Sequence, residues 1–314
     1  MKVRFEPHID IFTQRPNTSH MRTENTCSHW ISSSGNEGSR GSQSAIFPYW
    51  SFTKTTIAIC ALKLCEDSVL DLDAPIKGAA YTCRQLLAHT SGLPDYGQFP
   101  EYGRAVRAHE APWSREKMLD LSLSKGMLFE PEQGWSYSNI GYMFVRDMIE
   151  DATGQSLGQV VSSMICRPLH LDSIEFADTR EQFTKLHWHA AANYDPLWVY
   201  HGCLIGNAAD AARLLHGLFS GDLLRRDTLR LMIDTKLLGG PLPGRPWSQC
   251  GYALGLMSGS IDGIGRSIGH SGAGPFCVNA VYHFPDVDDP ITVASFTGGI
   301  DEGKAEFAAV ALVR

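Results

Sequence analysis

The chain has 314 residues, of which 43% are hydrophobic and 19% are charged, a composition typical of a globular protein with a large core and not of a disordered one. Its formal net charge is −7, and it has no basic run or aromatic-interleaved basic patch, so we expect no nucleic-acid partner. No apolar run approaches the roughly 18 residues of a membrane span, and the opening MKVRFEPHIDIF has no apolar signal-peptide core, so we expect a cytoplasmic protein without membrane contact. The eight cysteines form no C-x-x-C pair, which favours reduced, buried thiols over a zinc site.

The first 45 residues carry the weakest structural pattern. The run SSSGNEGSRGSQS, residues 32–44, is typical of a loop because it is rich in glycine and serine. Only residues 3–6 (VRFE) and 29–32 (HWIS) have the composition of short strands.

The stretch from residue 51 to 66 is predicted to be a helix whose apolar stripe contains a serine and a lysine. Residues spaced by three and four positions share one face of a helix. On this face lie Ser51, Lys54, Ala58, Ala61 and Cys65, with Leu62 beside it. The polar side is assigned to Thr55, Thr56, Lys63 and Glu66.

Two interpretations of the serine and lysine pair are open. In the first, Ser51 caps the helix start and the Lys54 amine extends along the surface to solvent. In the second, Ser51 is a nucleophile and Lys54 is its base, because a serine hydroxyl needs a base to attack a carbonyl and a desolvated lysine loses affinity for its proton. The helix N-terminus would then add N–H donors near the developing oxyanion.

Helical periodicity dominates the middle of the chain. Thr82 and Gln85 form a predicted capping box, and Gly92 is predicted to close the helix that this box opens. Further helices are predicted at 115–125, 140–153 (ended by Gly154), 156–166, 208–219 (ended by Gly221) and 225–233.

From about residue 250 the pattern changes to strand-like runs separated by glycines, at 252–259, 265–270, 277–284 and 291–296. Their spacing predicts an antiparallel meander, and residues 302–313 predict a terminal helix that covers one face. The predicted fold class is α/β of the α+β type, an antiparallel sheet flanked by helices plus a mainly helical subdomain. The sheet-bearing part is assigned to 1–68 and 245–314 and the helical part to 69–244, with the active site between them.

Two further short patterns lie downstream of the S-x-x-K pair. Tyr137 and Asn139 form a Y-x-N just before a predicted helix, and His270 and Gly272 form an H-x-G at the end of a predicted strand. Together the three ordered motifs resemble those of the penicillin-binding-protein and serine β-lactamase superfamily. The segments CRQLLAHTSGLPDY, GNAADAARLL and GYALGLM are similar to it as well, so the resemblance runs from about residue 46 to the C-terminus.

The resemblance implies a β-lactamase/transpeptidase-like fold and a set of functional residues. Ser51 would be the acylated nucleophile, Lys54 the acceptor of its proton, and Tyr137 the second member of the proton relay. Asn139 would hold Lys54 and the substrate amide, and the backbone N–H groups of Ser51 and Ala273 would form the oxyanion hole. Substrate contacts are expected from Asn139, His270, Ser271, Gly272 and Ala273. No metal and no cofactor are expected.

The chain departs from this superfamily at three places. Residues 1–45 are short and polar for the two strands and the helix that the resemblance implies there. Glu132 stands where the superfamily usually has glycine, which leaves the geometry of that turn open. His270 replaces the third-motif lysine that helps to bind a substrate carboxylate, and an imidazole with a pKa of about 6.5 is mostly neutral at cytoplasmic pH. This H-x-G variant resembles that of D-aminopeptidases, D-amino-acid amidases and some esterases.

Three other signals are weaker. The sequence around Ser271 is close to the nucleophile elbow of α/β-hydrolases, but Ala273 stands where the last glycine belongs and a strand follows where that fold needs a helix. His187 and His189 form an H-x-H without a marked third metal ligand. His201 stays ambiguous, because its segment is expected to pass near the cleft.

The sequence therefore predicts a cytoplasmic serine hydrolase that forms an acyl-enzyme on Ser51 and cleaves an amide or ester bond of a small substrate. A D-amino-acid amide or peptide is favoured. A carboxylesterase, a DD-carboxypeptidase and a β-lactamase remain alternatives, because cleft shape and water placement decide among them. A non-catalytic binding protein on the same scaffold is the alternative of another class, and the oligomeric state is left open.

Overall fold

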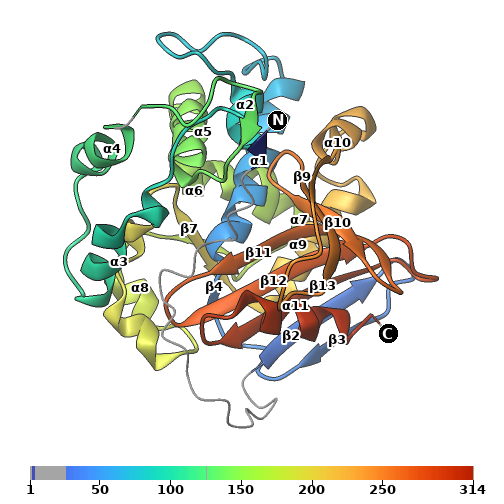
Figure 1. The fold of residues 1–314 in the computed structure, drawn as a ribbon. Coiled ribbons are helices and arrows are strands. Elements are labelled where there is room, and N and C mark those ends of the chain that lie inside the picture. Colours follow the sequence, from blue (N-terminus) through green and yellow to red (C-terminus); the bar gives the residue numbers. More distant parts are fainter. Residues whose placement is uncertain (1, 4–25, 125, 314) are drawn as a thin grey trace.

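The computed structural model of the protein describes residues 2–3, 26–124 and 126–313. Its centre is an antiparallel sheet of eight strands in the order β3-β2-β13-β12-β11-β10-β9-β8 (Figure 1). These strands are β2 (Thr26–Ser32), β3 (Glu37–Arg40), β8 (Lys236–Gly239), β9 (Trp247–Tyr252), β10 (Met257–Ile261), β11 (Gly265–Ala273), β12 (Cys277–Phe284) and β13 (Ile291–Gly298). The predicted fold class and the predicted meander after residue 250 are therefore confirmed. The single strand predicted at 252–259 is wrong, because the chain turns at 253–256 and the two sides of this turn belong to β9 and β10.

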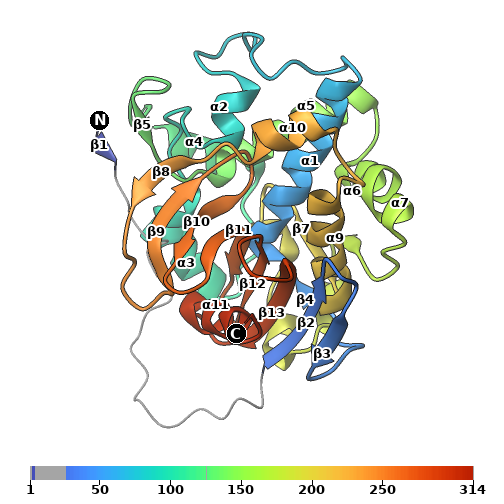
Figure 2. The ribbon, with the colours of Figure 1, turned by 90° about the vertical axis from the view of Figure 1, so that its right-hand side faces the viewer.

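Helices cover both faces of the sheet (Figures 1 and 2). Helix α11 (Glu302–Val310) packs on one face and α9 (Ala208–Ser220) on the other. Alternate residues of β12 accordingly enter two different hydrophobic cores. Cys277 and Val281 belong to the core on the α9 side, and Val278 and Ala280 belong to the core on the α11 side. Every residue of β12 is buried for this reason.

The remaining elements form the helical layer and two small sheets. The helices are η2 (Trp50–Phe52), α1 (Thr53–Glu66), α2 (Cys83–Leu87), η3 (Tyr96–Gln98), α3 (Pro100–Arg107), α4 (Arg115–Leu123), α5 (Asn139–Thr153), α6 (Leu157–Val161), η4 (Ser162–Cys166), α7 (Arg167–Leu169), α8 (Arg180–Thr184), η5 (His189–Asn193), η6 (Pro196–Trp198) and α10 (Arg226–Met232). The small sheets join β4 (Phe47–Pro48), β7 (Cys203–Gly206) and β6 (Glu175–Ala177), and β1 (Lys2–Val3) with β5 (Gly134–Trp135). Within the described part of the chain, no helix is both long and apolar enough to cross a membrane.

The predicted helix ends are correct where glycine ends a helix and wrong at Gly92. Gly154 and Gly221 end α5 and α9 in the left-handed conformation. The capping box of Thr82 and Gln85 is present, but α2 already ends at Leu87. Gly92 lies beyond that end, in the left-handed conformation with φ +81°.

The N-terminal region contributes a hairpin to the main sheet. Strand β2 pairs with β13 and β3 pairs with β2, so the predicted strand at residues 29–32 is confirmed. The loop predicted for 32–44 is wrong at β3, because hydrogen bonding to β2 overrides the loop-like composition. Of the predicted strand at residues 3–6, residues 4–6 lie outside the described part of the chain.

Helix α1 lies in the interior and is buried on all sides along its first three turns. The predicted polar side is wrong at Thr55 and Thr56, both of which are completely buried. The Thr55 hydroxyl donates a hydrogen bond to the carbonyl of Gly255 at 2.7 Å, which satisfies its polar group without solvent. A helix enclosed on every side has no amphipathic requirement, so its sequence periodicity does not report burial.

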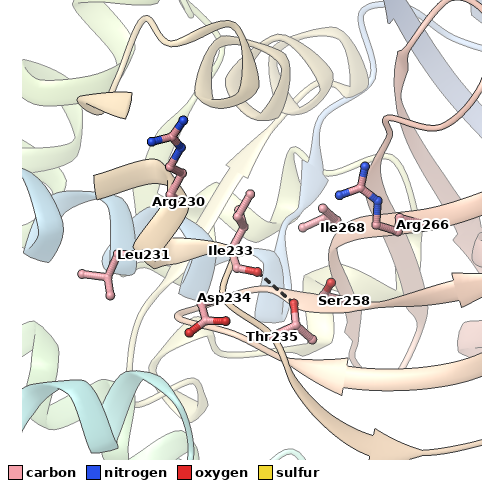
Figure 3. A pocket seen from close by; sticks show the side chains of 8 residues that line it. All are labelled: Arg230, Leu231, Ile233, Asp234, Thr235, Ser258, Arg266 and Ile268. Atoms are coloured by element: carbon pink, nitrogen blue, oxygen red, sulfur yellow. Dashed lines mark hydrogen bonds between the residues drawn. The ribbon is translucent and has the colours of Figure 1, made fainter. Parts of the chain in front are cut away.

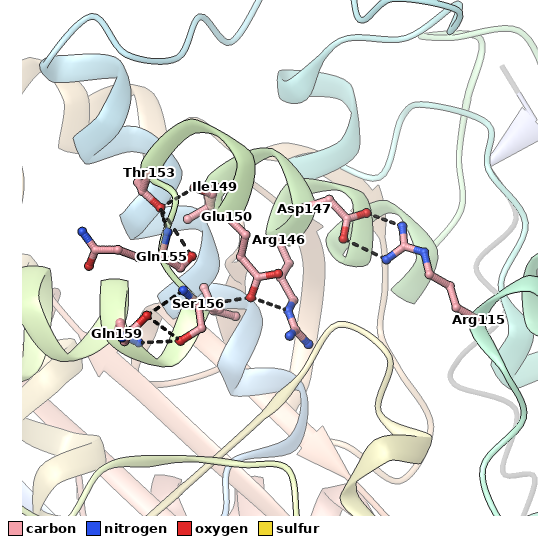
Figure 4. Close-up of polar contacts among 10 residues, drawn as sticks. Arg115, Arg146, Asp147, Ile149, Glu150, Thr153, Gln155, Ser156 and Gln159 are labelled. Atoms are coloured by element: carbon pink, nitrogen blue, oxygen red, sulfur yellow. Dashed lines mark hydrogen bonds and ion pairs between the residues drawn. The ribbon is translucent and has the colours of Figure 1, made fainter.

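Ion pairs hold helix α5, which begins at Asn139 (Figure 4). Arg115 of α4 forms a bidentate ion pair with Asp147 of α5. Glu150 accepts hydrogen bonds from the Arg146 side chain at 3.0 Å and from a backbone N–H of α6 at 2.8 Å. These contacts fix α5 between its neighbours and thereby fix the segment before it, which carries Tyr137.

The turn at Glu132 keeps a conformation that ordinarily suits glycine. Glu132 has φ +66°, its backbone N–H donates to the carbonyl of Thr90 at 2.9 Å, and its carboxylate accepts from the Thr90 hydroxyl at 2.6 Å. The hydrogen bonds to Thr90 offset the strain of a side chain in the left-handed region.

Close packing against α1 requires glycine at position 255. Gly255 has φ +75°, and a β-carbon there would lie 2.4 Å from Cβ of Ala58. We expect Gly255→Ala to lower the free energy of unfolding by about 3 kcal/mol or more, since it adds overpacking to backbone strain. The matched control is Gly263→Ala, at φ +76° with open space around its β-carbon, which should lose only about 1 kcal/mol in urea denaturation. Equal losses would contradict this packing.

Candidate active site

A cavity of about 820 Å³ lies where the helical layer meets the ends of β9 and β11 and the start of α11. Four of the predicted site residues line it, namely Ser51, Tyr137, Asn139 and Ala273. Its other walls are strongly aromatic, with Trp50, Tyr96, Tyr102, Trp135, Tyr194 and Tyr252. The tertiary structure thus brings residues separated by more than two hundred positions in the chain to one site.

Ser51 and Lys54 are in direct contact at the start of α1. The Lys54 Nζ lies 3.2 Å from Ser51 Oγ, and the lysine is completely buried. Burial lowers the pKa of Lys54 to about 7, against the opposing effect of Asp95. The interpretation as a capping serine and a solvent-reaching lysine is wrong, because Ser51 makes no capping hydrogen bond and Lys54 does not reach solvent.

The residue before Ser51 has a strained backbone. Trp50 has φ +45° although it is bulky, and it is nearly completely buried. Its indole N–H donates to Cys277 Sγ at 3.2 Å, and its ring meets that of Tyr194 edge to face at 5.4 Å. This packing holds the strained conformation and with it the backbone N–H of Ser51.

Tyr137 approaches the serine and lysine from the segment before α5. Its hydroxyl is buried, and it is close enough to Ser51 for that side chain to affect its pKa. The Lys54 Nζ lies 4.9 Å from the centre of its ring. Burial raises the pKa of Tyr137 well above its usual value, an effect larger than the opposing one of Ser51, so Tyr137 carries its proton at neutral pH.

Asp95 is a site residue that the sequence analysis did not identify. It accepts hydrogen bonds from the backbone N–H of Asn139 at 2.9 Å and from the Asn139 side chain at 3.0 Å. Burial raises its pKa to about 6, while these bonds and the charge of Lys54 lower it. Asp95 belongs to the segment CRQLLAHTSGLPDY, but a single aspartate in a loop has no spacing that marks it. In the structure the Asn139 amide binds Asp95, a partner that the resemblance did not imply.

His201 is a second polar neighbour of the Lys54 amine. Its Nε2 is 3.1 Å from Lys54 Nζ, the residue is only 2% exposed, and it lines the cavity. The structure thus places the segment before β7 at the site.

None of the three residues of the third motif lines the cavity; Ala273, the residue after the motif, does. His270 is completely buried and its Nε2 is hydrogen-bonded to the Tyr252 hydroxyl at 3.0 Å, so Tyr252 lines the cavity and His270 does not. Ser271 points to the opposite face of β11, where its hydroxyl donates to Glu306 of α11 at 2.6 Å. A β-carbon at Gly272 would lie 2.9 Å from Cβ of Trp50, so glycine here permits β11 to approach the turn before α1.

The arginine that lines the cavity is neutralised by two carboxylates. Arg245 contacts Glu302 and Glu306 of α11 at 2.5 Å each. Glu306 also accepts from the indole N–H of Trp247 at 3.0 Å. This arginine is therefore less available to bind a substrate carboxylate than an unpaired one.

A second hollow of about 630 Å³ lies beside the end of α10 (Figure 3). It contains Ser258, but no lysine, histidine or tyrosine is among the side chains that line it. Its arginines are paired elsewhere, Arg230 with Asp227 and Arg266 with Asp286. The described part of this hollow offers no activated nucleophile. Across residues 26–124 and 126–313, no group of three or more His, Cys, Asp or Glu side chains is placed to hold a metal ion.

The eight-stranded antiparallel sheet, the interior helix α1 and the three motifs together define a member of the penicillin-binding-protein and serine β-lactamase superfamily. The sequence model of the family described as Beta-lactamase matches residues 29–311, and the chain belongs to this family. The predicted resemblance is therefore confirmed.

Known proteins similar to this chain include a penicillin-binding protein, an esterase and a D-amino acid amidase. Penicillin-binding protein 4* of Bacillus subtilis (strain 168) is 31% identical over 152 residues, which cover 43% of this chain and 32% of that protein. Esterase EstB of Burkholderia gladioli is 27% identical over 168 residues, which cover 47% of this chain and 42% of that protein. The matches thus span about a third to a half of the curated relatives. The crystal structure of D-amino acid amidase from Ochrobactrum anthropi SV3 superposes with a TM-score of 0.76 at 22% identity, covering 92% of this chain and 94% of that chain, which shows a shared fold.

Proposed function

We propose that the protein is a serine hydrolase that forms an acyl-enzyme on Ser51 and hydrolyses an amide or ester bond of a small substrate. The observation that carries this proposal is the buried contact of 3.2 Å between Lys54 Nζ and Ser51 Oγ. A lysine whose pKa is lowered to about 7 is neutral in about half of the molecules at that pH, and its amine can accept the serine proton.

Acylation follows from these groups. As Ser51 Oγ bonds to the substrate carbonyl carbon, its proton passes to Lys54, and the carbonyl oxygen becomes an oxyanion held by the N–H groups of Ser51 and Ala273. Tyr137 donates a proton to the leaving amine or alcohol when the carbon–leaving-group bond breaks, and regains one from the Lys54 ammonium. Water then attacks the acyl-enzyme, with its proton taken up along the same relay, and releases the acid and Ser51.

A D-amino-acid amide or peptide is the favoured substrate. The neutralised Arg245 makes the cavity a poor binder of a substrate carboxylate, whereas Asp95 and Asp301 add carboxylates to its lining. Such a lining favours an amino group over a carboxylate, and the aromatic walls favour an apolar side chain. The solved D-amino acid amidase of the same fold is consistent with this choice.

A substrate panel tests the proposal. The values of kcat/KM are compared for five substrates: D-phenylalanine amide, L-phenylalanine amide, a D-Ala-D-Ala peptide, p-nitrophenyl butyrate and nitrocefin. We expect D-phenylalanine amide to have the highest value, at least about 10-fold above the L-enantiomer, a difference of about 1.4 kcal/mol in transition-state binding. Turnover of the butyrate ester alone would assign an esterase, an activity named for the similar EstB protein.

A further inference from the structure

His201 is a buried histidine whose described hydrogen bonding is limited to Lys54. Its Nε2 lies 3.1 Å from Lys54 Nζ, and its Nδ1 is buried without a hydrogen-bond partner among the described residues. Buried polar atoms are nearly always satisfied, and leaving one unsatisfied costs free energy. An apolar side chain at this position would avoid that cost, so the contact with Lys54 is the feature that accounts for a histidine here.

The protonation of His201 is set by its surroundings. Burial lowers the pKa of His201 well below its ordinary value, and the positive charge of Lys54 lowers it further. The titratable and charged groups around this pair are Asp95, Tyr137, Tyr142, Arg146, His89, Cys203 and His270. The imidazole is therefore neutral, with one nitrogen protonated and the other an acceptor.

The tautomer decides what the Lys54 amine can do. A neutral amine has two N–H groups and one lone pair. If His201 carried its proton on Nε2, it would donate to that lone pair and withdraw it from Ser51. If the proton is on Nδ1, then Nε2 accepts an N–H of Lys54, and the lone pair of the amine remains for the Ser51 hydroxyl, which lies 3.2 Å from Nζ.

We propose that His201 is a positioning residue, which as the Nδ1–H tautomer accepts a hydrogen bond from Lys54 and thereby directs the amine lone pair at Ser51 Oγ. This inference rests on the proposed function, since it assigns a partner to the base of that reaction. The same bond also stabilises the ammonium that forms on Lys54 when Ser51 loses its proton.

Two substitutions separate this role from packing. His201→Phe keeps the ring volume and removes the acceptor, and we expect the single-turnover acylation rate with a p-nitrophenyl ester to fall about 10- to 100-fold, the value of a hydrogen bond to a charged group. Because the Lys54 ammonium loses its acceptor, the pKa of Lys54 should fall. The rise of the acylation rate with pH, which is the acid limb of the pH profile, should therefore move to lower pH. His201→Gln, which can present an oxygen near the Nε2 position, should restore the rate to within about 3-fold. His216→Phe on α9 is the matched control and should leave rate and limb unchanged.

Either of two results would overturn the proposal. The first is a His201→Phe protein whose acylation rate and acid limb are unchanged, and the second is an equal loss of acylation rate in His201→Gln and His201→Phe. If His201→Phe does not fold by circular dichroism, the tautomer of the wild-type protein decides. Long-range ¹⁵N–¹H correlation at pH 8 should report Nδ1–H for His201, and Nε2–H would overturn the inference. This measurement needs no turnover, so it is distinguishable from failure of the proposed function, which would appear as absence of an acyl-enzyme on wild-type Ser51.

Discussion

Replacing Ser51 with alanine is expected to lower kcat/KM for the best amide or ester of the panel by at least about 10³-fold, because no acyl-enzyme can form. Fluorophosphonate treatment of the wild-type protein should add one label at Ser51, detected by mass spectrometry of the intact chain and its peptides. The Ser51→Ala protein should take up none.

The matched control for this experiment is Ser220→Ala, at the exposed C-terminal end of α9. It removes a serine without touching the cavity and should leave labelling and turnover unchanged. Wild-type turnover in Ser51→Ala would show that another group is the nucleophile. A folded wild-type protein that neither labels nor turns over any substrate would favour the binding protein over the hydrolase.

Replacing Lys54 with methionine is expected to remove the base and to lower the acylation rate by at least about 10³-fold. In the wild-type protein the rate should rise with pH through about 7, since Lys54 accepts the Ser51 proton only as a neutral amine. That limb should be absent from the residual activity of Lys54→Met. The matched control is Lys63→Met near the end of the same helix. The wild-type Lys63 amine donates a hydrogen bond to the carbonyl of Leu223 at 2.9 Å, away from Ser51, so this variant should keep the rise of the rate with pH.

The same substitution has an effect on stability that does not depend on activity. The pKa of Lys54 is about 7 in the folded protein and close to its ordinary value, roughly 10.4, in the unfolded chain. Between these values the unfolded chain binds more protons, so Lys54 contributes stability that is complete above about pH 10 and is lost as pH falls toward 7. As pH falls through this window, the unfolding free energy of the wild type should decrease relative to that of Lys54→Met by up to about 1.4 kcal/mol per pH unit. A difference independent of pH would mean that Lys54 stays charged in the folded protein.

Much of the fold could be predicted because its signals are local. Glycines that end α5 and α9 and the capping box of Thr82 and Gln85 act on the residues next to them, so the sequence reports them directly. Strand β3 and the end of α2 were missed because pairing with β2 and the turn after Leu87 outweigh local composition. Burial of Thr55 and Thr56 was missed for a similar reason, since it depends on what surrounds α1.

The three motifs and the helix and strand patterns were enough to predict the family, the class of fold and the contact between Ser51 and Lys54. Three residues separate them on one helix, and helical geometry alone brings them together. The other groups that face this pair come from distant parts of the chain and could be found only in the folded protein. Asp95 and His201 carry no motif, yet loop packing places both at the site, while strand alternation on β11 and the Tyr252 hydroxyl keep Ser271 and His270 off the cavity wall. The physical reason is that burial and proton affinity depend on the groups that surround a side chain, and distant segments supply most of those groups.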